Sequence, residues 1–544
     1  MIAIMILAGC GKKTTGIGGA SAAAELIPAD AAMVFSIEHP ESLYQRLHLG
    51  ELLPLMSGGD SKWNAFMDLD SLRTMGLDPL LPVTIAVFGE DPATFAVFLE
   101  GDGRDLGKNL RDVLERESQT VKSLATQENT EILGDEEGKY SYFTSERFLV
   151  VSGSSDPDTV RALTVAQKIL NVSPDQSLGR SADYRDAIAK LSAGRDLSFY
   201  GRIDMESQIV RAKKELASQE DVDPGLAALV EKVVRMAEDV RGSAGAVSFI
   251  PNGLTAEGYA GIKSGSELLS FLEPASGSGS FHRRIPGKPR FLYDFNFNAQ
   301  ALWTWVRANV IDEIEDISEG FDKAEKELRQ ELGIELEQDL IRQIKGDMML
   351  LIDQVAFIGS DAVLYFQIDR PDVFQQTLDK VVEYAKTRTG GQQPTFEKDE
   401  VGGVSFYIIA MPPFAEVCCG IVENYLVISS TRARFGQIVD GDSGFADALE
   451  YQALTDAMGH NPTSLFYLDL ELISQVLNAF GGFIQQDQAG VPQMAESVLQ
   501  ELKLKHFLAT GFAEDDGIRT TIRIESDRSD FWAGLADLTK KFAQ

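Results

Sequence analysis

Two matching stretches open the two halves of this sequence: Ile27-Pro28-Ala29-Asp30-Ala31-Ala32-Met33-Val34-Phe35-Ser36-Ile37 and Ile285-Pro286-Gly287-Lys288-Pro289-Arg290-Phe291-Leu292-Tyr293-Asp294-Phe295. Both begin with Ile-Pro, pass through a polar turn and end in an alternating apolar run, the pattern of a strand with one buried face. Pro28 and Pro286 are 258 positions apart, about half of the chain. We interpret the two stretches as the openings of two similar units.

Further matches follow in the same order along the chain. Gly333-Ile334-Glu335 follows Gly76-Leu77-Asp78 by 257 positions. Residues 425–429 follow 148–152 by 277 positions, and the extra length lies around 401–419. Other matched segments are 83–88 with 348–352, 94–100 with 363–368, 198–200 with 465–467, and the closing hairpins 244–262 with 507–524. A chance similarity of common patterns is the alternative, but the near-constant offsets favour an internal duplication.

The expected fold class is α+β, with antiparallel sheets packed against long amphipathic helices. Strand patterns come in consecutive hairpins and helix patterns are grouped between them, which argues against a doubly wound parallel sheet. Expected hairpins join 140–144 to 148–152 and 244–250 to 254–262. Apolar residues at helical spacing predict long helices at 204–217, 225–240, 301–332, 373–387 and 494–502.

The expected domain organisation follows from the duplication. The segments are a lipoprotein signal segment (1–9), a flexible tether (10–25), a first α+β unit (26–273), a linker (274–284), a second α+β unit (285–530) and a C-terminal helix (531–544). The linker is rich in Gly and Ser, as flexible connections are. If the two copies are independent, cutting within 276–280 should give two folded halves.

The charge balance limits the possible partners. The chain of 544 residues carries 50 basic and 83 acidic residues, a formal net charge of −33. A surface of this sign repels nucleic acid and anionic lipid, so neither is an expected partner of the body of the protein. Solubility alone is a sufficient explanation of the charge. No uninterrupted apolar run approaches the roughly 20 residues that a helix needs to cross a bilayer.

The first ten residues, Met1-Ile2-Ala3-Ile4-Met5-Ile6-Leu7-Ala8-Gly9-Cys10, form a short apolar stretch that ends in small residues and a cysteine. Leu7-Ala8-Gly9-Cys10 resembles the lipobox of bacterial lipoproteins. The resemblance implies cleavage before Cys10 and a lipid anchor on its thiol, so Cys10 is the candidate lipidation residue. An apolar tail with an incidental cysteine is the alternative. Signal segments usually begin with basic residues, so we expect the natural start upstream of Met1.

The resemblance to lipoproteins also bears on localisation. The residue after Cys10 is not aspartate, which in such proteins implies the outer membrane, on its periplasmic face or at the cell surface. The duplicated plan and the opening Leu26-Ile27-Pro28-Ala29-Asp30 resemble a large uncharacterised family of bacterial envelope proteins, known only as a domain of unknown function. That resemblance covers most of residues 25–530, implies an extracytoplasmic protein and supplies no catalytic residues.

No segment matches a motif for catalysis or cofactor binding. Gly403-Val404-Ser405-Phe406-Tyr407 lacks the final glycine of a nucleophile elbow. Gly11-Lys12-Lys13-Thr14 lacks the first glycine of a phosphate loop, where Ile6 stands. Asp440-Gly441-Asp442-Ser443-Gly444 lacks the acidic fifth residue and the glycine at the sixth position of a calcium loop. The five histidines and three cysteines show no zinc spacing. We therefore predict no catalytic residue, no metal and no cofactor.

Two other features of the sequence resemble functional sites. Carboxylate pairs such as Asp68/Asp70 and Glu335/Glu337 arise freely in so acidic a chain, and spacing alone does not show a shifted pKa. Cys418-Cys419 falls on an expected strand, where adjacent side chains point to opposite faces and a disulfide between them would be strained. We predict two small strand residues, at least one of them buried; a redox pair is the alternative.

These observations favour a non-enzymatic, membrane-anchored envelope lipoprotein that acts as an interaction or scaffold body for an unknown envelope protein. The alternative is a carrier of a lipid or another apolar ligand held between or within the two units. A carboxylate-dependent hydrolase has the least support, because no motif favours it.

Overall fold

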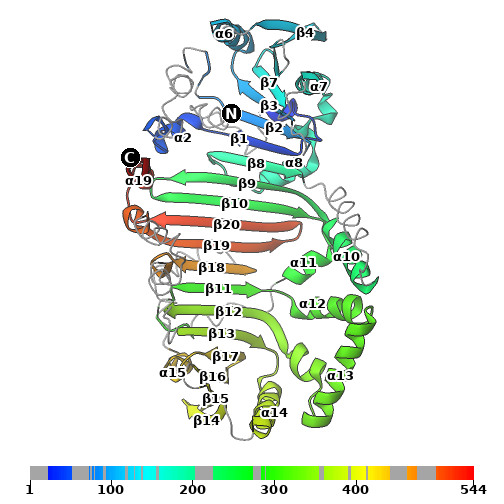
Figure 1. Cartoon of the computed structure of the whole chain (residues 1–544), viewed down its shortest axis with the longest axis vertical. Helices are drawn as coiled ribbons and strands as arrows, with labels where there is room; N and C mark the ends of the chain where they lie inside the picture. The colour runs from blue at the N-terminus through cyan, green and yellow to red at the C-terminus, as the bar shows by residue number, and fades with distance from the viewer. Residues whose placement is uncertain are drawn as a thin grey trace. The chain divides into compact units, whose positions relative to one another are not determined.

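The computed structural model has the expected α+β fold (Figure 1). It describes residues 22–51, 73, 76–78, 80–89, 94–116, 120–127, 129–135, 139–154, 159–202, 224–273, 284–287, 289–354, 361–389, 394–411, 415–441, 462–473 and 498–543. The strand pairs β1–β2, β1–β8, β11–β12 and β11–β18 are antiparallel, as a fold built from hairpins requires. Among the helices in these ranges, none is both long and apolar enough to cross a membrane.

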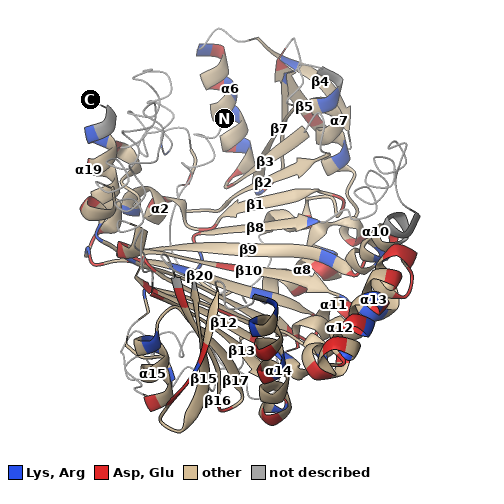
Figure 2. Cartoon of the chain, turned by 60° about the horizontal axis from the view of Figure 1, so that its bottom comes forward, with Lys and Arg blue, Asp and Glu red and all other residues tan. Residues whose placement is uncertain are grey.

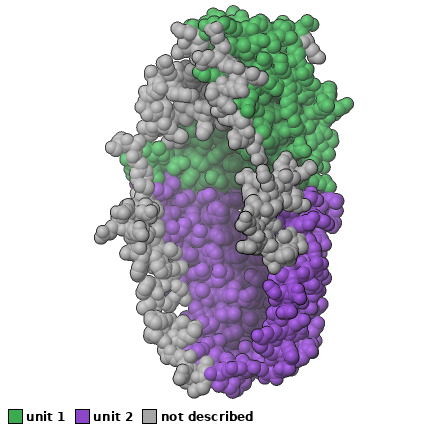
Figure 3. Space-filling model, turned by 45° about the vertical axis from the view of Figure 1, so that its right-hand side comes forward, with its two compact units in different colours: residues 1–205, 240–261, 526–544 green, residues 206–239, 262–525 purple. Residues whose placement is uncertain are grey.

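Two compact units divide the chain, and each gathers segments from distant parts of the sequence (Figure 3). Unit 1 comprises Met1–Met205, Val240–Gly261 and Ser526–Gln544, and unit 2 comprises Glu206–Asp239 and Ile262–Glu525. The units differ from the predicted boundaries in three helices: α10 (Pro224–Ala237) and α11 (Glu267–Leu272) belong to unit 2, and the C-terminal α19 (Phe531–Ala543) belongs to unit 1. Local patterns identify a helix, but they do not tell on which distant element its apolar side packs.

The sheet of unit 1 has the strand order β10-β9-β8-β1-β2-β3-β7-β6-β5-β4. Its strands are β1 (Met33–Ile37), β2 (Val83–Phe88), β3 (Thr94–Glu100), β4 (Val121–Gln127), β5 (Thr130–Asp135), β6 (Tyr140–Thr144), β7 (Phe148–Ser154), β8 (Leu197–Arg202), β9 (Val240–Ile250) and β10 (Gly253–Ile262). Both hairpins expected here, β6–β7 and β9–β10, are confirmed.

The sheet of unit 2 has the order β20-β19-β18-β11-β12-β13-β17-β16-β15-β14. Its strands are β11 (Phe291–Asn296), β12 (Ile344–Gln354), β13 (Asp361–Ile368), β14 (Thr395–Val401), β15 (Val404–Met411), β16 (Ala415–Val422), β17 (Tyr425–Ser429), β18 (Ser464–Asp469), β19 (Leu504–Glu514) and β20 (Gly517–Ser526). Matching each strand of unit 1 with the strand ten places later gives the same order, so the duplication is confirmed.

The strand registers repeat as well. Phe35 pairs with Phe199 across β1–β8, and Tyr293 pairs with Phe466 across β11–β18. Tyr293 follows Phe35 by the 258 positions that separate the two opening stretches. The second offset also holds: Phe148 pairs with β3 at Glu100, and its match 277 positions later, Tyr425, pairs with β13 at Gln367. Both offsets therefore place their matched residues at the same point of the two sheets.

Helices cover one face of the unit 1 sheet and part of the other. Val165 and Ile169 of α7 (Thr159–Leu170) and Ile188 of α8 (Ala182–Ala189) are buried with Val34 and Phe98, which point to the same face. Helix α6 (Gly103–Arg116) packs on the opposite face, where its Leu106 joins Tyr142 and Leu149. The end of the predicted flexible tether is also ordered, because Ala22–Glu25 forms a 3₁₀ turn whose Ala23 and Ala24 lie in this core.

One aromatic side chain of helix α19 packs closely against unit 1. The indole N–H of Trp532 is 2.9 Å from the carbonyl oxygen of Ile250 and 3.2 Å from that of Gly253, on either side of the β9–β10 turn. Its ring meets Phe249 edge to face, with centroids 5.1 Å apart, and Trp532 is 7% exposed. The C-terminal helix thus closes one end of the β9–β10 hairpin.

The predicted single helix 301–332 is wrong, because two helices with a π-helical turn between them occupy this stretch. They are α12 (Ala299–Val306), the turn Arg307–Ile311, and α13 (Glu315–Leu332). Ile314 leaves the helical conformation at φ −107° and ψ 106° and is buried. Glu315 and Asp316 then begin α13, where acidic side chains interact well with the helix dipole. Acidic residues continue along α13 (Figure 2).

Other helices of unit 2 are α11 (Glu267–Leu272), α14 (Pro371–Thr389) and α15 (Arg432–Asp440). Helix α13 ends at Gly333, whose φ of +59° forms a left-handed cap. Its match in unit 1, Gly76, also has a positive φ of +79°, so the 257-residue offset marks a shared turn. The predictions at 1–9, 204–217, 274–283 and 494–497 lie outside the described residues.

Candidate binding sites

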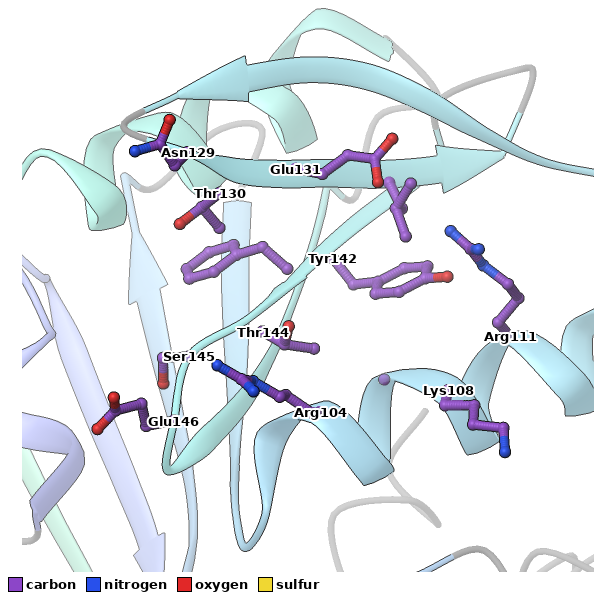
Figure 4. Close-up of a pocket in the computed structure, with 13 residues that line it drawn as sticks. Arg104, Lys108, Arg111, Asn129, Thr130, Glu131, Tyr142, Thr144, Ser145 and Glu146 are labelled. Carbon is purple, nitrogen blue, oxygen red and sulfur yellow. The ribbon is translucent and has the colours of Figure 1, made fainter.

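A cavity of about 600 Å³ opens in unit 1 between helix α6 and strands β5 and β6 (Figure 4). Ligand pockets in proteins commonly have roughly 300–1,000 Å³. Leu133 of β5 and the ring of Tyr142 from β6 supply its apolar wall, whereas the neighbouring Phe143 points into the core on the opposite face. Uncharged polar groups come from Asn129, Thr130, Thr144 and Ser145, and carboxylates from Glu131 and Glu146.

Three cations line the cavity from helix α6: Arg104, Lys108 and Arg111. Steps of four and three residues place them on one side of the helix. Arg104 and Arg111 point toward strand β6, whereas Lys108 points away from it (Figure 4). Within the described part of the chain, none of the three forms an ion pair with a carboxylate.

Close packing fixes α6 against the β6–β7 hairpin. A Cβ at Gly107 would lie 2.3 Å from Cγ2 of Thr144, and one at Gly103 would lie 2.0 Å from a backbone carbonyl oxygen of the hairpin turn. Only glycine allows so close an approach at these two positions. The helix start is held by Asp102, whose carboxylate accepts the backbone N–H of Arg104 at 3.0 Å. The cations are therefore carried by a well-anchored helix.

Tyr142 forms the back wall beside Arg111. Its side chain is 1% exposed and its hydroxyl points at the guanidinium of Arg111 (Figure 4). Burial raises the pKa of Tyr142, and the nearby Arg111 only partly opposes the rise. The hydroxyl therefore stays protonated at neutral pH and can donate a hydrogen bond to a ligand.

The equivalent place in unit 2 is filled. The strand registers put Tyr407 where unit 1 has Leu133. Counted from the first residue of each helix, Asp379 of α14 stands where α6 has Arg111. The Tyr407 hydroxyl donates to a carboxylate oxygen of Asp379 at 2.7 Å, and Lys398 donates to the same oxygen at 3.4 Å. Unit 2 therefore has a buried tyrosine and an acidic partner where unit 1 has a cavity and a cation.

A second candidate surface is one face of the unit 2 sheet. Alternate residues of six neighbouring strands form it, and almost all are half-buried: Phe291, Tyr293, Phe295, Met348, Leu350, Ile352, Leu364, Phe366, Leu426, Ile428, Phe466, Leu468 and Phe507. The residues between them form the buried core on the opposite face. Tyr293 is 38% exposed. Phe466 stacks edge to face with Phe291 and Phe507 at 5.3 and 5.5 Å. We call these thirteen residues the apolar face.

Unit 1 exposes a smaller patch at the matching strands. Met33 and Phe35 of β1 and Phe199 of β8 are 43%, 39% and 38% exposed, and the two phenyl rings lie 6.5 Å apart. Toward β7, helix α6 covers the same face at Leu99 and Leu149. Both units thus present aromatic side chains from their central strands.

Two of the three cysteines occupy ordinary buried positions on a strand. Cys10 lies outside the described residues. Cys418 and Cys419 are adjacent on β16, and both are buried free thiols. The registers put Cys418 where unit 1 has Ser141. Cys418 pairs with Ser429 on the next strand, as Ser141 pairs with Ser152. The sequence-based interpretation as small, buried strand residues agrees with this placement.

The carboxylate pairs do not form a site in the described residues. Asp68 and Asp70 lie outside them. Glu337 forms an ion pair with Arg342 at 2.6 Å, and Glu335 lies 3.5 Å from Arg329. The described ranges contain no group of three or more His, Cys, Asp or Glu side chains placed to hold a metal ion.

The sequence motifs did not identify the cavity. Its signal was present as three cations on one side of a helix within a strongly acidic chain. That signal gains meaning only when the opposing strands are known, because solvated basic faces are common on helices.

Comparisons with known proteins give a family but no activity. The model of a family described as "Protein of unknown function (DUF3352)" matches residues 85–504. No curated protein matches the sequence. A structure of crystal form III of TP0453 is 10% identical, covering 44% of this chain and 79% of that one, with a TM-score of 0.25. Crystal form I of TP0453 is 8% identical, covering 45% and 79%, with a TM-score of 0.24. A TM-score this low establishes neither a shared fold nor a shared function.

Proposed function

Because the matched region spans more than half of its length, the chain belongs to the DUF3352 family of proteins of unknown function, and on this premise we propose a non-enzymatic, lipid-anchored protein of the cell envelope. Its two sheet units act as an interaction or scaffold body for another envelope protein. The apolar face of unit 2 is the observation that carries this proposal.

An apolar surface of this extent that is only half-buried suits a partner better than bulk water. Soluble monomers rarely expose contiguous apolar patches larger than a few hundred Å². Aromatic residues are enriched at the centres of protein interfaces, where they bury much area at little entropic cost. Tyr293 and Phe466 lie side by side near the middle of the apolar face, with centroids 6.3 Å apart. These two residues are the proposed centre of the interface.

The apolar face can be tested with a photoreactive amino acid at Tyr293 in cells, beside the same residue at Lys323 on the exposed side of α13. The proposal expects a discrete protein adduct from Tyr293 that Phe466→Ser abolishes, and no such adduct from Lys323. Adducts of equal pattern at both sites would show that the face is not selective, and the interaction role would be abandoned.

The envelope anchor rests on Leu7-Ala8-Gly9-Cys10, which resembles a lipobox, and on the small residues that follow it. The test compares wild type with Cys10→Ala, both expressed from an extended start. A lipid-sized mass on Cys10, together with release of the variant from membranes, is the expected result. An unmodified Cys10 in a soluble wild-type protein would overturn the anchor and the compartment.

A second candidate is the carriage of a lipid or another apolar ligand. The observation in its favour is the continuous aliphatic part of the apolar face, where Leu350, Leu364 and Leu426 come from neighbouring strands. Such a surface can hold acyl chains without polar contacts. Extraction and mass spectrometry of the purified protein separate the two functions. A lipid at one or more equivalents per chain, lost in Leu364→Asp, would favour the carrier.

A further inference from the structure

We propose that the cavity beside helix α6 binds a small anion that bears a phosphate group. This site is independent of the apolar face and goes beyond the proposed scaffold function. It rests on the charge of the cavity, on its polar lining and on the filled equivalent in unit 2.

The charge of the cavity runs against that of the chain. Acidic residues outnumber basic ones by 33 overall, yet three cations and two carboxylates line this cavity, although Lys108 points away from strand β6. Arg104 and Arg111 both point toward the strand wall, and neither is neutralised by an ion pair within the described residues. Unpaired guanidinium groups that converge on a recess favour an anion, and their planar fork suits the oxygens of phosphate.

The lining provides hydrogen-bond donors as well as charge. Tyr142, buried and protonated, points its hydroxyl at the space beside Arg111, and Thr130 and Thr144 add hydroxyls nearby (Figure 4). Leu133 and the ring of Tyr142 form an apolar wall for a sugar or another organic part of the ligand. A phosphate with an organic substituent would contact the cations, the hydroxyl groups and the apolar wall.

The filled equivalent in unit 2 shows that the cavity is not required by the architecture. Leu106 of α6 and Phe374 of α14 occupy the same helix position and are both buried, which fixes the comparison of the two helices. In that register Arg111 corresponds to Asp379. With Tyr407 hydrogen-bonded to Asp379, unit 2 closes the space that Leu133 leaves open. The cavity and its charge are therefore specific to unit 1.

The test titrates inorganic phosphate into the full chain by calorimetry, at constant ionic strength with chloride as the control anion. Arg104→Gln with Arg111→Gln should weaken phosphate binding at least about tenfold, because each lost charged hydrogen bond contributes substantially. Lys323→Gln with Lys326→Gln, on the exposed side of α13, removes two cations without touching the cavity and should leave binding unchanged. Absence of phosphate binding by wild type, or equal loss in both double variants, overturns the proposal.

A second variant transfers the unit 2 arrangement into unit 1. Arg111→Asp with Leu133→Tyr should reproduce the tyrosine–aspartate hydrogen bond, keep the thermal unfolding temperature near that of wild type and abolish phosphate binding. This variant keeps the test decisive if the glutamine variants fail to fold. A folded transfer variant that still binds phosphate as wild type does would refute the site.

Two sources of phosphate can be distinguished with the same proteins. Vesicles of phosphatidylcholine, with and without phosphatidic acid, are added to the full chain carrying Cys10→Ala. The acidic surface disfavours an anionic bilayer, so we expect a soluble phosphorylated compound: free phosphate binds and the vesicles do not. Vesicle binding that requires Arg104 and Arg111 and is displaced by phosphate would assign the site to a lipid head group. If neither free phosphate nor the vesicles bind, the proposal is wrong.

Discussion

The hydroxyl of Tyr407 donates a hydrogen bond of 2.7 Å to the carboxylate of Asp379, which joins strand β15 to helix α14. Partial burial alone would raise the pKa of Asp379, but the hydrogen bonds from Tyr407 and Gln375 and the charge of Lys398 outweigh it and lower the pKa below its ordinary value of 3.8. The folded protein therefore prefers the ionised carboxylate.

This preference predicts a pH-dependent stability. A carboxylate with a lowered folded pKa stabilises the fold above its unfolded pKa, and the contribution disappears as the pH falls through the folded pKa. Asp379→Asn should therefore melt at a lower temperature than wild type at pH 7, and the difference should shrink once the pH is below 3.8. Thermal melts at pH 7 and pH 3 measure this. Glu400→Gln, an exposed change on β14, serves as the control; a difference at Asp379 that is independent of pH would contradict the argument.

The close contact of Gly107 with Thr144 predicts a compensating pair. Gly107→Ala gains helix propensity of about 1 kcal/mol, but its Cβ meets Cγ2 of Thr144, and overpacking costs about 1–3 kcal/mol. We expect a net loss of unfolding free energy. Thr144→Ser removes the clashing methyl group, so the double variant should be at least as stable as Thr144→Ser alone. Denaturant unfolding of all four proteins gives the coupling, and simple additivity would mean that the helix moves aside without cost.

The thiols of Cys418 and Cys419 should be unreactive in the folded protein. Burial, and next the charge of Glu416, raise the pKa of Cys418 to about 12, and burial raises that of Cys419 to about 11. Since the thiolate is the reactive form, a thiol reagent at pH 8 should label neither residue until denaturant is added. The Cys10→Ala background leaves only these two thiols to count. Rapid labelling of the native protein would reopen the redox alternative.

The same register explains why a cysteine suits position 418. In unit 1 the hydroxyls of Ser141 and Ser152 lie 2.8 Å apart, and both residues are fully buried. Cys418 and Ser429 occupy the matching positions, where only a small side chain fits. Cys418→Ser should therefore change the unfolding free energy by less than Cys418→Val, and equal effects would show that the position tolerates bulk.

The sequence predicted those parts of the fold that depend on the local conformational preferences of single residues. The prolines at 28 and 286 and the glycines at 76 and 333 are conformational markers, so their offsets located the repeat. The hairpin β4–β5 was missed because its strands are half-exposed and mostly polar, without a clean alternation. The interruption of the helix at Ile314 was missed because the apolar stripe continues through it. The cavity was missed because Arg104 and Arg111 become a pair only when Tyr142 is brought opposite them.

The placement of α19 in unit 1 changes the expected result of cutting the chain in the predicted linker. Unit 1 contains α19 from the C-terminus, so a cut between residues 273 and 284 separates Trp532 from the β9–β10 turn that it caps. Losing this indole from a buried site costs about 3–5 kcal/mol. The same cut leaves α10, which belongs to unit 2, on the first fragment, where Lys232 loses its ion pair with Glu313 at 3.2 Å.

Each fragment alone should therefore be protease-sensitive, and the two should be stable only when expressed together. Residues 22–262 joined through a flexible linker to 526–544 should be more soluble than 22–262 alone, and Trp532→Ala should remove that gain. Limited proteolysis of the three proteins measures it. If residues 22–262 resist proteolysis equally with and without the helix, Trp532 is a surface attachment and the fragments made by the cut are the true folding units.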